Sequence, residues 1–213
     1  AKEPLSENRD AEIESPVIAN DLSNQKVTAI AEDTQGHIWI GTFRGLNKNN
    51  VHDYHQYFCT DDSLGLPDNQ ITHLLRDSKN RFWVGTVNGV CLYTDKDNFR
   101  IIPIEADNKN VRQILEDRNG RIFLNTGFQL YAYHPREEKI TCVLPEISPG
   151  NAFYAQCHIA PDNNLWVMTS TGLRCYDPST LQLKESVALS GYPYYSYPVS
   201  YTHLRAHETV LDL

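Results

Sequence analysis

Hydrophobic and polar residues alternate along most of this chain, and short turns interrupt the alternation at regular intervals. Alternation with a period of two is typical of strands in a half-buried sheet, and no segment shows the spacing of an amphipathic helix. Three alternating segments end in an acidic residue, at positions 27–33, 71–77 and 111–117. Residues that tolerate a positive φ follow them, at Gly36, Asn80 and Gly120. The pattern predicts an all-β chain of short strands joined by tight turns.

A five-residue cassette with a central aromatic side chain and a closing threonine recurs four times. The aromatic residues are Trp39, Trp83, Phe123 and Trp166, and the threonines are Thr42, Thr86, Thr126 and Thr169. Steps of 44, 40 and 43 residues separate the aromatic positions. Units of four short strands with a period of about 40–45 residues are typical of β-propeller blades. We therefore expect these eight residues to be structural, with the four aromatic side chains buried at equivalent places between neighbouring blades.

The repeats predict an incomplete β-propeller array of about four four-stranded blades within residues 22–190. The expected blades are residues 22–62, 66–105, 107–146 and 150–190. Residues 1–21 form a polar lead-in, and residues 191–199 are compatible with the start of a fifth blade. Residues 200–213 do not follow the repeat. Two interpretations of this tail stay open, a cloning-derived sequence and a native C-terminal helix.

Binding residues are expected on one face of the propeller, where the loops between second and third strands meet the segments that lead into the first strands. Amide, aromatic and Arg side chains there suit sugar hydroxyls and carboxylates, and they equally suit solvated loops. The predicted ligand-binding residues are Arg44, Asn69, Asn88, Gln129 and Thr171. By contrast, Asp33, Asp77 and Asp117 recur once per blade before a turn, which favours hydrogen bonds to turn amides over catalysis.

The composition narrows the range of partners. Lys and Arg number 19 against 27 Asp and Glu, for a formal net charge of −8, so nucleic acid is not an expected partner. No apolar run is long enough to span a membrane, and a signal peptide or anchor would have to lie outside this sequence. The 5 cysteines show no C-x-x-C spacing, which supports neither a zinc ribbon nor a disulfide framework.

Three clusters have the residue types of metal sites: the first two lack the spacing of a zinc or calcium site, and the third has a spacing that would suit zinc on a helix but lies in the non-repeat tail. They are His52-Asp53-Tyr54-His55, Asp95-Lys96-Asp97-Asn98, and His203 with His207 and Glu208 in the tail. No nucleophile elbow, P-loop or dinucleotide fingerprint occurs either. We therefore predict no metal, no cofactor and no catalytic residue.

Residues 27–46 read Val-Thr-x-Ile-x-Glu-Asp-x-x-Gly-x-Ile-Trp-Ile-Gly-Thr-x-x-Gly-Leu and resemble the two-component regulator propeller repeat. Residues 71–90 resemble it nearly as well. Residues 111–130 and 154–173 follow the same register with departures. The departures are Phe123, Asn125 and Gln129 in the third repeat and Ala160 and Met168 in the fourth.

The resemblance implies a periplasmic sensor domain of a Bacteroidetes-type hybrid two-component histidine kinase. Its expected partners are an oligosaccharide or other small molecule, the remaining propeller blades, and kinase domains outside this chain. Kinase activity would then not belong to this chain, which we expect to be a non-enzymatic sensor of carbohydrate-derived signals. The alternative is a propeller enzyme, a lyase or hydrolase, and a convergent His, acid and Arg cluster on the channel face would favour it.

Energetics add an expectation about self-association. An array cut after four blades leaves two apolar blade faces in water, and patches of several hundred Å² are seldom left exposed by monomers. We therefore expect the chain to associate through its open blade faces.

Overall fold

The computed structural model describes residues 17–19, 21–50, 53–60, 65–94, 97–147, 155–169 and 171–188. Within these ranges the regular elements are all strands, arranged in antiparallel sheets, which confirms the all-β prediction. The described part of the chain contains no helix that could cross a membrane. The predicted start of a fifth blade at 191–199 and the tail at 200–213 lie outside the described residues.

Four sheets follow one another along the chain, and each is built around a four-stranded meander, as the repeat predicts. Blade 1 contains β2 (Val27–Glu32), β3 (Ile38–Thr42), β4 (Gly45–Asn50) and β5 (Asp53–Tyr57). Blade 2 contains β6 (Ile71–Arg76), β7 (Phe82–Thr86), β8 (Gly89–Tyr93) and β9 (Phe99–Ile102). Blade 3 contains β10 (Gln113–Glu116), β11 (Ile122–Asn125), β12 (Leu130–His134) and β13 (Lys139–Leu144). Blade 4 contains β14 (Gln156–Ile159), β15 (Leu165–Thr169), β16 (Gly172–Tyr176) and β17 (Leu183–Ala188).

Blade 1 has a fifth strand that the repeat did not predict. Residues of the expected lead-in form β1 (Val17–Ala19), which pairs antiparallel with β5 at the outer edge of the sheet. Two hydrogen bonds fix the following segment on the same blade, from the Ser23 amide to Asn47 Oδ1 at 2.8 Å and from Gln56 Nε2 to the Asp21 carbonyl at 2.8 Å. A strand of three residues is too short to reveal its period in the sequence.

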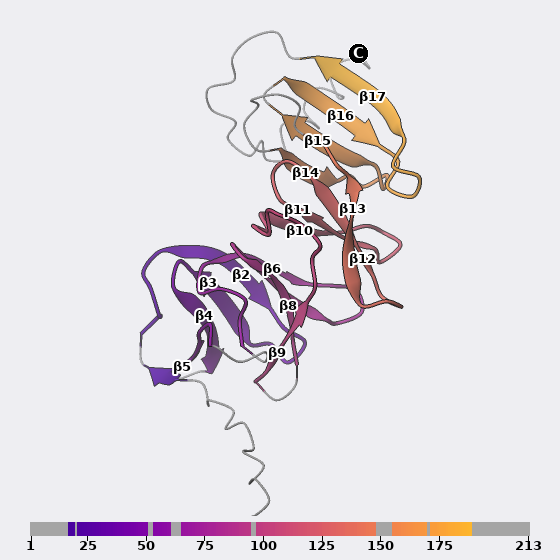
Figure 1. Ribbon diagram of the computed structural model, residues 1–213. Helices are drawn as coiled ribbons and strands as arrows, with labels where there is room; N and C mark the ends of the chain where they lie inside the picture. Colours follow the sequence, from indigo (N-terminus) through magenta and orange to yellow (C-terminus); the bar gives the residue numbers. More distant parts are fainter. Residues whose placement is uncertain are drawn as a thin grey trace, which may run out of the picture.

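The hydrophobic core lies between the blades rather than within one sheet. The first strands β2, β6, β10 and β14 lie next to one another, and Figure 1 shows the sheets following in chain order. Trp39 of blade 1 packs against Phe82 and Tyr93 of blade 2, with ring centroids 5.0 and 4.6 Å apart. Trp83 meets Tyr133 of blade 3 in the same manner, at 4.9 Å. Phe123 of blade 3 clusters with Leu165 and Val167 of blade 4, so blades 1, 2 and 3 each bury their aromatic residue against the next blade.

The prediction of four equally buried aromatic residues is wrong for the last of them. Trp39, Trp83 and Phe123 are almost fully buried, whereas Trp166 is partly exposed. The cause is the position of blade 4, which lies at the end of the described array, opposite blade 1 (Figure 1). No described blade covers the face that presents Trp166, so its depth differs although its place in the repeat is the same.

Candidate functional site

In blades 1, 2 and 3 one aspartate organises the turn between the first two strands, whereas blade 4 has Ala160 at this position. Asp33 Oδ1 accepts hydrogen bonds from the Gln35 and His37 amides at 2.8 and 3.0 Å. The corresponding bonds are Lys79 and Arg81 to Asp77 at 3.0 and 2.8 Å, and Asn119 and Arg121 to Asp117 at 2.9 and 2.9 Å. The prediction that these carboxylates bind turn amides is confirmed.

In blades 1 and 2 the second oxygen of this aspartate accepts the indole N–H of the buried tryptophan, whereas in blade 3 Asp117 Oδ2 accepts the Arg121 guanidinium. Asp33 Oδ2 accepts the Trp39 indole N–H at 2.8 Å, and Asp77 Oδ2 accepts that of Trp83 at 2.8 Å. Partial burial by itself raises the pKa of Asp33, but the hydrogen bonds from Trp39, His37 and Gln35 outweigh it and hold this pKa below its ordinary value. These carboxylates are therefore structural acceptors whose lone pairs are already in use.

Each closing threonine holds the loop that carries a predicted binding residue. Thr42 Oγ1 donates to the Gly45 carbonyl at 2.8 Å and accepts the Arg44 amide at 3.1 Å. Thr86 and Thr169 bind the amides of Asn88 and Thr171 in the same way, each at 3.2 Å. The side chains of Arg44, Asn88 and Thr171 are exposed on these loops.

The other two predicted binding residues are already engaged in contacts within the protein. Asn69 Oδ1 accepts the Cys59 amide at 2.7 Å, and the Asn69 carbonyl accepts the Gly45 amide at 2.7 Å. Asn69 therefore joins blade 1 to blade 2. Gln129 Oε1 accepts the Tyr131 hydroxyl at 2.7 Å and lines an open hollow of about 480 Å³ beside blade 3. This hollow is lined by Ile104, Glu105, Ala106, Asp107, Lys109, Gln129, Tyr131 and Cys142. A single site formed by all five predicted residues stays a prediction.

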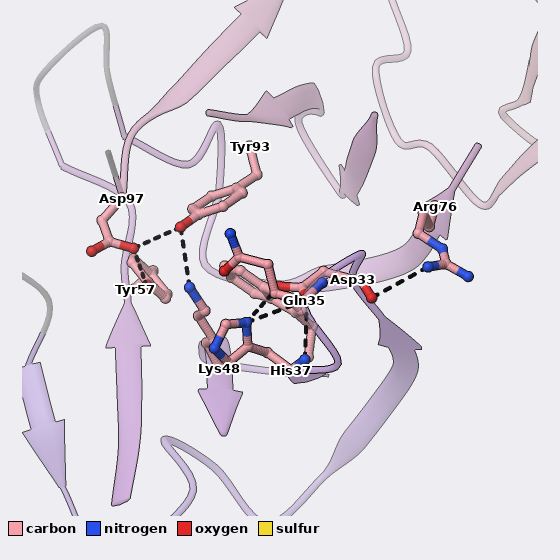
Figure 2. Close-up of polar contacts among 9 residues, drawn as sticks. Asp33, Gln35, His37, Lys48, Tyr57, Arg76, Tyr93 and Asp97 are labelled. Atoms are coloured by element: carbon pink, nitrogen blue, oxygen red, sulfur yellow. Dashed lines mark hydrogen bonds and ion pairs between the residues drawn. The ribbon is translucent and has the colours of Figure 1, made fainter. Parts of the chain in front are cut away.

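A second hollow, of about 370 Å³, lies between blades 1 and 2 beside the turn that follows β2, and we call it the interblade hollow (Figure 2). Blade 1 contributes Asp33, Thr34, Gln35 and Lys48, and blade 2 contributes Arg76, Asn80, Phe82, Tyr93, Thr94 and Asp97. Polar and charged side chains from two blades therefore meet at one place. Such convergence is what a binding site for a small polar molecule requires.

One hydrogen-bonded network crosses the interblade hollow (Figure 2). Asp97 Oδ1 accepts the hydroxyls of Tyr57 and Tyr93 at 2.7 and 2.8 Å, and Lys48 Nζ donates to the Tyr93 hydroxyl at 3.3 Å. Burial raises the pKa of Tyr57 and of Tyr93, and the hydrogen bonds to Asp97 raise both further. Burial also raises the pKa of Asp97, but the two phenol donors and the charge of Lys48 outweigh this and lower it. The network therefore keeps Asp97 ionised and both phenols neutral at pH 7.

Sequence reasoning missed the interblade hollow, although one signal was present. Lys48 lies directly across the strand pair from Trp39. The residues at this position in the other blades are Leu92, Ala132 and Cys175. Lys48 is therefore a charged residue at a position that is apolar in the other three blades, and this difference marks the place where blade 1 departs from the repeat.

Metal ligation finds no support among the described residues, which contain no group of three or more His, Cys, Asp or Glu placed to hold an ion. Of the clusters considered from sequence, Asp53 and His55 approach to 3.9 Å, and Asp97 binds the two tyrosines. His52, Asp95, Lys96 and the tail residues His203, His207 and Glu208 lie outside the described residues.

Two segments of the chain match a known family of repeats. Residues 21–44 and 65–88 match the family model described as the two component regulator propeller. No curated protein matches the chain. The matched residues lie in the first two repeats, which carry the cassette in its fullest form.

Solved structures of several kinds share the fold. The extracellular domain of a putative hybrid two component system from B. thetaiotaomicron is 23% identical with a TM-score of 0.67, over 79% of this chain and 23% of that chain. Virginiamycin B lyase from Staphylococcus aureus is 19% identical with a TM-score of 0.60, over 81% of this chain and 59% of that one. An auxiliary nutrient binding protein from Bacteroides thetaiotaomicron is 11% identical with a TM-score of 0.57, over 82% and 44%.

These structures include an extracellular domain of a putative two component system, a lyase and a nutrient binding protein, so the shared fold does not decide the function. This chain spans less than a quarter of the length of that extracellular domain, at 23%. The likeness establishes the propeller architecture, and function has to be argued from the repeats and the hollows.

Proposed function

We propose that this chain, two segments of which match the two component regulator propeller, is the extracytoplasmic, ligand-sensing part of a hybrid two-component signalling protein. The observation that carries the proposal is the match at residues 21–44 and 65–88. Likeness to the extracellular domain of a hybrid two component system supports the same assignment and a periplasmic location.

The sensed molecule in this proposal is small and derived from carbohydrate. Sugar recognition uses amide, hydroxyl and charged groups beside aromatic rings, and the interblade hollow offers all four. A ligand that contacts two blades binds most tightly at one distance between them. Binding therefore shifts the population of blade arrangements toward the arrangement with that distance. Further blades and kinase domains outside this chain are the partners that would receive this shift.

Catalysis is the competing function, because lyase-type propellers share the fold. A lyase needs an acid or base within hydrogen-bond reach of the reacting atom. The exposed predicted residues Arg44, Asn88 and Thr171 come from three different blades and offer guanidinium, amide and hydroxyl groups. This set suits binding better than proton transfer near pH 7.

A paired assay on the purified chain tests the proposal. Thermal unfolding is followed across a panel of oligosaccharides, and the same mixtures are analysed for products. A ligand at about 100 times its Kd should stabilise the fold by about 2.7 kcal/mol, which raises Tm by roughly 5–11 °C. Stabilisation without product supports sensing. Product formed in proportion to protein concentration would establish an enzyme instead, and a panel without any stabilising member would refute carbohydrate sensing.

A second assay tests the relay to the kinase. In the full-length protein, deletion of residues 22–190 should abolish the transcriptional response to the stabilising oligosaccharide. An unchanged response after the deletion would refute a sensing role for this region.

A further inference from the structure

The interblade hollow contains two cations that form no direct ion pair, although the charge of Lys48 acts on Asp97. Lys48 comes from blade 1 and Arg76 from blade 2, and neither forms an ion pair within the described part of the chain. Other cations near the same blade faces are paired: Arg81 with Asp77 at 2.7 Å and Arg121 with Asp117 at 2.5 Å. The two unpaired cations therefore retain donors that can bind a ligand.

The carboxylates that line the hollow are occupied by other donors. Asp33 accepts the Trp39 indole and the His37 ring on Oδ2, at 2.8 and 3.0 Å, and two backbone amides on Oδ1. Asp97 Oδ1 accepts two phenols. The two carboxylates and the two cations that line the hollow have a net formal charge of zero, so the hollow does not attract anions in general. Any selectivity has to come from the placement of individual donors.

Lys48 is the donor whose placement is most tightly fixed. Its ammonium lies 5.3 Å from the ring centroids of both Trp39 and Tyr93, and one of its three N–H groups faces the Tyr93 hydroxyl. Lys48 is partly buried, so its charge is partly removed from water, and the two aromatic rings offset part of that cost. Two N–H groups remain for a ligand.

Arg76 contributes a second set of donors at the rim. One guanidinium nitrogen donates to the Asp33 carbonyl at 3.3 Å, which leaves the others open to solvent. Figure 2 shows Lys48 and Arg76 on either side of the turn that carries Asp33 and Gln35. The exposed amides of Gln35 and Asn80 line the hollow beside them. A bound molecule would thus meet a half-buried ammonium at one end and a guanidinium and amides at the other.

We propose that the interblade hollow binds a small hydroxylated carboxylic acid of the sugar-acid class. Its carboxylate accepts hydrogen bonds from Lys48, and its hydroxyl oxygens accept from Arg76 and the amide of Gln35 or Asn80. The volume of about 370 Å³ lies at the small end of the range for ligand pockets, roughly 300–1,000 Å³, which favours one or two sugar units. This inference rests on the proposed sensing function and names the chemical class of the ligand and the residues that select it.

Calorimetric titration of the purified chain with sodium glucuronate, glucose and sodium phosphate tests the site. Glucuronate is expected to bind at least tenfold more tightly than glucose or phosphate. Lys48→Met keeps the length of the side chain and removes the donor, and it should weaken glucuronate binding tenfold or more. Arg76→Gln should weaken it about threefold. Arg118→Gln is the control, because Arg118 is an exposed arginine in the turn that follows β10 of blade 3 and does not line the hollow. This substitution should leave the affinity unchanged.

Three results would overturn the inference: no binding of glucuronate at millimolar concentration, equal binding of glucose, or unchanged affinity in Lys48→Met. Melting curves of each variant show whether the fold is retained, and Lys48→Arg, which restores a cation, should recover part of the affinity if Lys48→Met is destabilised. If an oligosaccharide binds independently of Lys48, the sensing function stands and this site fails. If glucuronate binds through Lys48 but the full-length protein gives no response, the site stands and the sensing function fails.

Discussion

The indole-to-aspartate hydrogen bond in blade 2 offers a direct measure of what the repeat signature contributes to stability. Trp83 Nε1 donates to Asp77 Oδ2 at 2.8 Å, and both side chains are almost fully buried. Trp83→Phe removes this donor and keeps an aromatic ring in the layer. Blade 3 shows that the layer accepts the smaller ring, because Phe123 takes the same place there.

The expected cost follows from the partners of Asp77. A hydrogen bond to a charged group contributes about 1.5–3 kcal/mol to stability. Arg81 Nε also binds Oδ2, at 2.7 Å, so the carboxylate stays satisfied and the loss falls toward the lower end of that range. We expect the free energy of unfolding to fall by about 2 kcal/mol, which corresponds to a Tm lower by roughly 4–8 °C.

Urea unfolding followed by circular dichroism measures this loss, and blade 4 supplies the matched control. Trp166 is partly exposed, and Ala160 stands where an aspartate would accept its indole. Trp166→Phe should therefore cost less than about 1 kcal/mol. Trp83→Phe in an Asp77→Asn background should also cost less than in the native protein, because the acceptor charge is gone. Equal losses for Trp83→Phe and Trp166→Phe would refute the role assigned to the hydrogen bond.

Three further predictions concern packing, pH and association. Gly41→Val should lower the free energy of unfolding by about 1–3 kcal/mol, because even its Cβ would lie 2.5 Å from Ile71 Cγ2, and adding Ile71→Ala should recover part of this; an additive double variant would contradict the clash. The pKa of Asp33 lies below 3.8, so its contribution to stability should be complete above that pH and lost as pH falls through the folded-state pKa, and an equally steep acid decline in Asp33→Asn would contradict this. Light scattering should show a mass that rises with concentration and falls in Trp166→Glu, whereas a monomer at every concentration would exclude association through the open blade faces.

Features that recur once per blade could be predicted from the sequence, because they depend on contacts between residues that are close together in the chain. Asp33 before a turn and Thr42 at the end of β3 bind residues at most six positions away, so their spacing contains the necessary information. The depth of Trp166 could not be predicted in this way. It depends on whether another blade covers it, which is a property of the array and not of the repeat.

The interblade hollow depends on contacts that span a whole blade. Lys48 and Tyr93 are 45 residues apart, and Tyr57 and Asp97 are 40 apart, so only the stacking of blades 1 and 2 brings them together. The face that carries Asn69 could be predicted, but its amide oxygen is used by the Cys59 backbone. Loop position alone does not distinguish a free polar group from one that already has a partner.

Small residues opposite larger ones at the blade contacts explain why these four blades remain an open array. The contacting pairs are Gly41 with Ile71, Gly85 with Val111, and Asn125 with Ala155. The equivalent residue of blade 4 is Met168, and the equivalent first residue of blade 1 is Val27. Closing the ring at four blades would place these two large side chains at a contact where a Cβ on Gly41 would already clash. The open face of blade 4 therefore fits a neighbour that presents a small residue at this position, and blade 1 does not offer one.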